Sequence, residues 1–97
     1  MRVEVSSEAV SRVLADGGKL WVWAAYPKRC CSGTPAYMHA STSQPATKLP
    51  FRPVAHPDLE IWFRAPGGRE PDVLEVGLHG RRKPKVEAYW DGCLIAL

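Results

Sequence analysis

The chain has 97 residues, a formal net charge of +3, 45% hydrophobic residues and 24% charged residues. This size and composition suit one small domain over residues 1–97, and they exclude both a disordered chain and large catalytic barrels. The longest apolar run, Leu20 to Tyr26, is far shorter than the roughly 20 residues of a membrane-spanning helix. The first residues carry acids and no apolar signal segment, so we expect a cytoplasmic protein without membrane contact.

The first part of the chain predicts a strand, a helix and a second strand. Arg2 to Val5 is typical of a short strand, and apolar residues at helical spacing then predict a helix between the serines at 6–7 and the glycines at 17–18. Lys19 to Tyr26 is rich in aromatic and β-branched residues and is apolar on both faces. We therefore expect a central strand that is covered on both sides, with Trp21 in the core.

The remainder of the chain predicts further strands, most of them with alternating apolar residues. We expect them at residues 36–41, 51–55 (an edge strand), 59–64, 73–78 and 85–90, before an apolar tail at 93–97. The fold class is therefore α+β, with one N-terminal helix packed on a small, mainly antiparallel or mixed β-sheet that curls around a small core.

Basic residues gather in two parts of the sequence. No acid lies between Asp16 and Asp58, and the second cluster consists of Arg81, Arg82, Lys83 and Lys85. Such clusters can bind phosphates, and exposed aromatic residues near them can stack on bases. The net charge is modest and we expect Trp21 and Trp90 in the core, so solvated turns are the favoured interpretation. A basic nucleic-acid-binding module stays an alternative, for which we expect no binding at physiological salt.

The histidines do not predict an enzyme. His39, His56 and His79 show no spacing that is typical of a catalytic triad, although a pair of Cys31 with His39 is conceivable. Motifs that bind nucleotide phosphates are absent from the sequence. We therefore expect a non-catalytic protein.

The three cysteines are the most specific chemical feature of the sequence. Cys30 and Cys31 are adjacent, and Cys93 lies near the end of the chain. An odd count without a secretory signal argues against a disulfide framework, which leaves buried thiols, a redox site or metal ligands. Lys28 and Arg29 precede the thiol pair and would stabilise a thiolate, the form that binds soft metals and iron–sulfur clusters.

The segments VEVSSEAVSRVLADGG, LWVWAAY and Cys-Ser-Gly follow one another in an order that resembles the HesB/IscA-like family of A-type iron–sulfur carriers. The family's loop thiol corresponds to Cys31, followed by Ser32 and Gly33, and Cys93 is the counterpart of its C-terminal cysteines. Cys30 stands where the family has glycine, and the tail holds one thiol where the family has Cys-Gly-Cys.

The resemblance implies a barrel-like domain, a homodimer, and an iron–sulfur cluster or iron bound by cysteines. The cofactor would lie on Cys31 and Cys93, with Cys30 as a further metal ligand, and other iron–sulfur assembly or acceptor proteins would be the partners. Three thiols do not fill four tetrahedral positions, so His39 or a second subunit would complete the site. The alternative is a binding or scaffold domain on the same fold that has lost its metal site. We expect Cys31 and Cys93 to lie near each other and Cys30 to pack inward.

Overall fold

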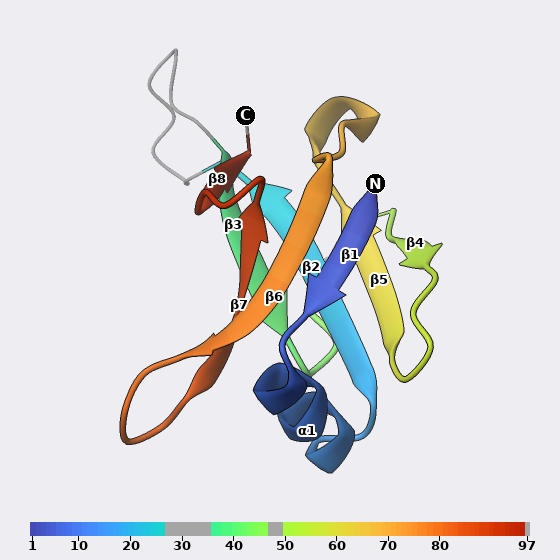
Figure 1. Cartoon of the computed structure of the whole chain (residues 1–97). Helices are drawn as coiled ribbons and strands as arrows, with labels where there is room; N and C mark the ends of the chain where they lie inside the picture. Colours follow the sequence, from blue (N-terminus) through green and yellow to red (C-terminus); the bar gives the residue numbers. More distant parts are fainter. Residues whose placement is uncertain (27–35, 47–49, 97) are drawn as a thin grey trace.

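The computed structural model of the protein describes residues 1–26, 36–46 and 50–96. These residues form one α-helix and eight strands in two mixed sheets (Figure 1). In chain order the elements are β1 (Arg2–Val5), α1 (Ser7–Ala15), β2 (Lys19–Ala25), β3 (Ala36–Ser41), β4 (Arg52–Val54), β5 (Glu60–Arg64), the short 3₁₀ turn η1 (Pro66–Gly68), β6 (Val73–His79), β7 (Lys85–Trp90) and β8 (Ile95–Ala96).

The two sheets differ in size. The three-stranded sheet has the order β1-β6-β7, and the five-stranded sheet has the order β4-β5-β2-β3-β8. The pairs β1–β6 and β2–β5 are parallel, whereas the other pairs are antiparallel. The predicted central position of β2 and the predicted edge position of β4 are confirmed.

The expected barrel-like α+β domain is wrong, because the described residues form a mainly β fold of two open sheets. Strands β3 and β7 come close to each other, yet no ladder joins them within the described part of the chain. The edge of β3 pairs instead with the two-residue β8, and among the described strands β7 forms a ladder only with β6. A single nine-residue helix is also too small to define an α+β layer.

The inner faces of both sheets share one hydrophobic core. The period of two places alternate residues of each strand inside. The buried strand residues are Leu20, Val22 and Ala24 of β2, Ala36 and Met38 of β3, Ile61 and Phe63 of β5, Leu74 and Val76 of β6, and Ala88 and Trp90 of β7. The rings of Phe63 and Trp90 lie 6.3 Å apart across the two sheets, which confirms the predicted core position of Trp90.

Helix α1 closes one end of the core, at the bottom of Figure 1. Ser6 caps its first turn, because the Ser6 hydroxyl accepts a hydrogen bond from the Ala9 N–H at 3.1 Å. Ala9 and Val13 are completely buried in the core. No helix in the described residues is long and apolar enough to span a bilayer.

Candidate functional site

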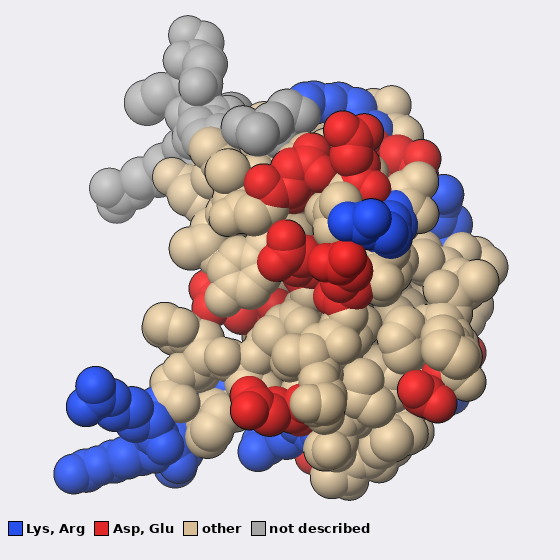
Figure 2. Space-filling view, viewed as in Figure 1, with Lys and Arg blue, Asp and Glu red and all other residues tan. Residues whose placement is uncertain are grey.

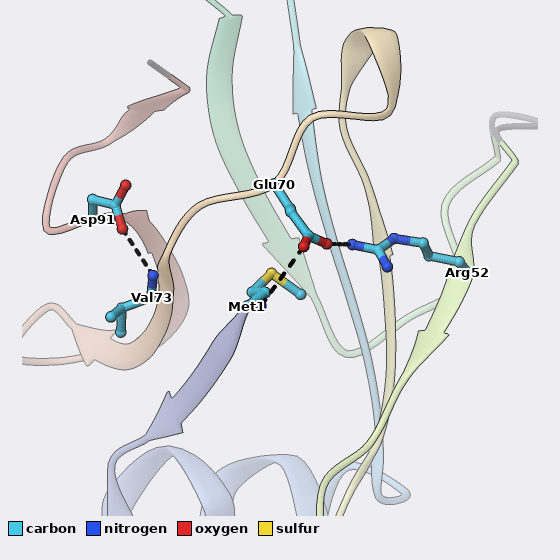
Figure 3. Close-up of polar contacts among 5 residues, drawn as sticks. All are labelled: Met1, Arg52, Glu70, Val73 and Asp91. Carbon is cyan, nitrogen blue, oxygen red and sulfur yellow. Dashed lines mark hydrogen bonds and ion pairs between the residues drawn. The ribbon is translucent and has the colours of Figure 1, made fainter.

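A tight turn after β7 holds Cys93. Trp90 and Cys93 exchange two backbone hydrogen bonds, of 2.7 and 2.9 Å, and the residues between them, Asp91 and Gly92, have φ angles of 48° and 84°. Two left-handed residues in succession are typical of a type I′ turn. The Asp91 carboxylate also accepts a hydrogen bond of 2.8 Å from the Val73 N–H (Figure 3). The backbone of Cys93 is therefore fixed, and its free thiol belongs to a half-buried residue.

The tail after Cys93 returns to the five-stranded sheet. Strand β8 pairs with the first two residues of β3, as Ala36 with Ala96 and Tyr37 with Ile95. On the other side of β3, Tyr37 pairs with Ala25, the last residue of β2. Cys93 thus lies two residues before β8, the strand that pairs with the start of β3, and β3 begins directly after positions 27–35.

The other two predicted ligands, Cys30 and Cys31, lie outside the described residues. The expected approach of Cys31 to Cys93 and the expected inward packing of Cys30 therefore stay predictions. Within residues 1–26, 36–46 and 50–96, no three His, Cys, Asp or Glu residues are grouped so that they could hold a metal ion. The proposed additional ligand, His39, lies on β3, where its ring stacks on Trp23 at 5.4 Å.

The remaining histidines have other surroundings. The Nδ1 atom of His56 accepts hydrogen bonds from the backbone N–H groups of Asp58 and Leu59, at 3.1 and 3.2 Å, so this ring stabilises the turn before β5. His79 is highly exposed at the end of β6, and its Nδ1 lies 3.6 Å from the carboxylate of Glu87.

Aromatic side chains gather on the outer side of the five-stranded sheet. Trp21 is the register partner of Trp62, and Trp23 is the partner of His39. Phe51, just before β4, meets the Trp23 ring edge-on at 6.2 Å. We call this surface the aromatic face, and it consists of Trp21, Trp23, Tyr37, His39, Phe51 and Trp62.

The aromatic face corrects the expectation that β2 is covered on both sides with Trp21 in the core. Trp21, Trp23 and Trp62 are half-buried, and Tyr37 is 45% exposed. Helix α1 and the three-stranded sheet both pack on the opposite, inner side of β2. The strand alternation of Trp21 and Trp62 carried the signal for this face, but only the parallel pairing of β2 with β5 places the two rings side by side.

A groove of about 450 Å³ lies where β3 and β7 approach without pairing. Its lining comes from Met38, His39 and Ala40 on one side and from His79, Gly80, Lys83, Lys85, Val86, Glu87 and Ala88 on the other. We call it the basic groove. His39 lines the basic groove and also belongs to the aromatic face.

Charge is distributed unevenly over the molecule. Acidic side chains gather on the outer side of the three-stranded sheet, where Glu4 is the register partner of Glu75 (Figure 2). Burial, followed by a hydrogen bond to Glu87, raises the pKa of Tyr89 on this side. The tip of the β6–β7 hairpin, with Arg81, Arg82 and Lys83, projects from the body as a basic finger at the lower left of the view.

A cluster of charged groups around Glu70 connects the two sheets at the end of the molecule opposite to α1. The Glu70 carboxylate binds the Arg52 guanidinium and lies 3.6 Å from the Met1 ammonium (Figure 3). The hydrogen bond from Arg52 is the main cause that holds the pKa of Glu70 below its ordinary value. This cluster joins β4, the segment before β6, and the start of β1.

Comparison with family models, curated proteins and solved structures finds no match for the chain. The resemblance to HesB/IscA-like proteins therefore stays a prediction.

Proposed function

We propose that the protein binds iron or an iron–sulfur cluster through the thiolates of Cys31 and Cys93, with Cys30 as a further ligand. The function is binding and transfer rather than catalysis, and it takes place in the cytoplasm with iron–sulfur assembly or acceptor proteins as partners. A homodimer that shares the site, or His39 in a monomer, supplies the ligands that three thiols leave open.

One observation carries this proposal. The turn from Trp90 to Cys93 fixes the backbone of a half-buried cysteine, and β8 then pairs the same segment with the first residues of β3. Positions 27–35 include Cys30 and Cys31, and of the two strands that flank them, β3 begins beside β8 and β2 ends on the other side of β3. The ten residues between the end of β2 and the start of β3 set a limit on the distance of Cys30 and Cys31 from that end of the sheet, since each residue spans at most about 3.5 Å.

Anaerobic reconstitution tests the proposal. The full chain is incubated with ferrous iron and sulfide under reducing conditions, desalted, and measured by visible absorption and by iron and zinc content. We expect a sulfur-to-iron charge-transfer band and bound iron that Cys31→Ser and Cys93→Ser both abolish, while the thermal unfolding of the apo variants is unchanged.

Leu94→Ala is the matched control, because Leu94 is exposed and adjoins Cys93 without offering a ligand. It should retain the full amount of iron. A wild-type chain that takes up no metal under these conditions, or a Cys93→Ser variant that retains all of it, would contradict the proposal and favour the binding or scaffold domain.

A further inference from the structure

We propose that the aromatic face and the basic groove together bind single-stranded nucleic acid, and that this site functions independently of the thiols. The sequence alone argued against nucleic-acid binding because the net charge is modest and because Trp21 was expected in the core. The structure instead places three tryptophans on the outer side of the five-stranded sheet, and His39 on the same side also lines a groove that includes Lys83 and Lys85.

The aromatic face offers rings on which bases can stack. Same-face residues of a strand lie roughly 6.6 Å apart and neighbouring strands about 4.8 Å apart, so the register turns Trp62, Trp21 and Trp23 into a compact two-row platform. Beyond Trp23, the same face continues to Tyr37, which is 45% exposed. Base stacking on such platforms tolerates any sequence, because every base has a π-face.

The central ring of this platform is held in place before any ligand arrives. Trp23 is stacked against His39 with an interplanar angle of 21° and is met by Phe51 at 88°. The neighbouring Arg64 guanidinium reaches the Ala24 carbonyl at 3.4 Å, which holds this cation at the rim of the platform. A prearranged ring loses little side-chain entropy on binding, which favours affinity.

The basic groove supplies the counter-charge for a phosphate backbone. It begins at His39, where the platform ends, and brings Lys83 and Lys85 to its lining. Glu87 is the acid among its lining residues, and its carboxylate is engaged by the Tyr89 hydroxyl at 3.0 Å and approached by His79 at 3.6 Å. Arg81 and Arg82 extend the cationic surface along the projecting hairpin.

On the outer side of the five-stranded sheet, strand alternation in β2 and β5 places two cations, Lys19 and Arg64, and one acid, Glu60. The pair Glu4 and Glu75 lies on the outer side of the other sheet and so does not repel a polyanion on the aromatic face. On the aromatic face itself, Glu60 is the register partner of Lys19. Unpaired bases can stack on the aromatic rings of an open sheet face, whereas the bases of a duplex are already stacked on one another.

Fluorescence anisotropy with labelled oligouridine and oligothymidine of about 12 nucleotides tests the site, since single-strand sites of this kind cover roughly 4–16 nucleotides. We expect binding of both single strands, weaker binding of a matched duplex, and an affinity that falls linearly with the logarithm of salt concentration. Tryptophan fluorescence should be quenched on binding, as the exposed rings stack on bases.

Variants separate stacking from charge. Tyr37→Ala and Trp62→Ala should each weaken binding by about tenfold, and Trp62→Phe should restore most of it. The triple variant Arg81→Gln, Arg82→Gln, Lys83→Gln should reduce the salt dependence. Arg2→Gln on the opposite sheet is the matched control and should bind as the wild type does, as should Cys93→Ser, which separates this site from the thiol function.

Three results would overturn the proposal. The first is an absence of binding even at low salt. The second is equal binding of duplex and single strand with no effect of Tyr37→Ala, which would reduce the contact to general attraction between charges. The third is a concentration-dependent dimer in sedimentation experiments that Trp62→Ala and Tyr37→Ala disrupt, since a second copy would then cover the aromatic face.

Discussion

Two left-handed residues, Asp91 and Gly92, determine where the chain can present Cys93. A non-glycine residue at positive φ is uncommon, and Asp91 is tolerated because its carboxylate accepts the Val73 N–H and its own N–H binds the Val73 carbonyl at 3.1 Å. The turn thus anchors the end of β7 to the start of β6 as well as fixing the thiol. Gly92 has no such compensation and depends on the absence of a Cβ atom.

Gly92→Ala should therefore destabilise the fold by about 1–2 kcal/mol, the cost of a left-handed L-residue. A Cβ atom at Gly92 would meet nothing within 4 Å, so the loss would come from the backbone alone. Gly77→Ala on β6 is the matched control: its φ is not positive, the nearest atom to its Cβ would be 3.9 Å away on Tyr89, and we expect no loss of stability. Urea unfolding measures both variants, and equal free energies of unfolding would refute the assigned role of the turn.

At the scale of single elements, alternation in the sequence predicted the strands and their inward residues well. The alternation at 73–78 and 85–90 predicted Leu74, Val76, Leu78, Val86, Ala88 and Trp90 on the inner side. The strands Val73–His79 and Lys85–Trp90 bury Leu74, Val76, Ala88 and Trp90, whereas Leu78 and Val86 near the hairpin are half-buried. The period of two fixes which side chains share a face, and this information is local.

Alternation could not predict what lies opposite each face. The outer side of β2 is as apolar as its inner side, yet the inner residue Leu20 is fully buried and its neighbour Trp21 only half-buried. The difference arises from long-range pairing and from the position of α1, neither of which leaves a local pattern. The gap between β3 and β7, which forms the basic groove, is unpredictable for the same reason.

The inner face of the five-stranded sheet is buried and its outer face is only half-buried, and substitutions on the two faces test this difference. Phe63→Ala should cost about 3–5 kcal/mol, because the ring is fully buried and its loss leaves a cavity between the sheets. Trp21→Ala should cost only about 1–2 kcal/mol despite the larger side chain, because its ring already meets solvent. Chemical denaturation of both variants measures the difference. A loss at Trp21 as large as that at Phe63 would mean that the aromatic face is covered in solution.

At the scale of the whole molecule, β7 separates the two proposed sites. Its first residue, Lys85, lines the basic groove, whereas its last residue, Trp90, begins the turn that carries Cys93. The two proposed functions thus depend on residues at opposite ends of this one strand. Both ends depend on the two sheets staying packed, since β7 belongs to one sheet and both β3 and β8 belong to the other.

Glu70 is one of the polar ties between those sheets, because it connects Arg52 of β4 with the start of β1 (Figure 3). Its pKa in the folded protein is held below the ordinary value of 4.5, chiefly by the hydrogen bond from Arg52. The folded state therefore prefers the charged carboxylate more than the unfolded state does. The resulting stabilisation is fully present above pH 4.5 and is lost as the pH falls through the lowered pKa.

Glu70→Gln should consequently lower the melting temperature at neutral pH, and its difference from the wild type should shrink as the solution is acidified below pH 4.5. Because the pair is exposed, added salt should reduce the difference at neutral pH as well. The control is the same substitution in an Arg52→Gln background, where most of the difference should disappear, since Arg52 is the main cause of the lowered pKa. A difference that persists unchanged in that background, or that grows toward acid pH, would show that Glu70 acts through something other than its charge on Arg52.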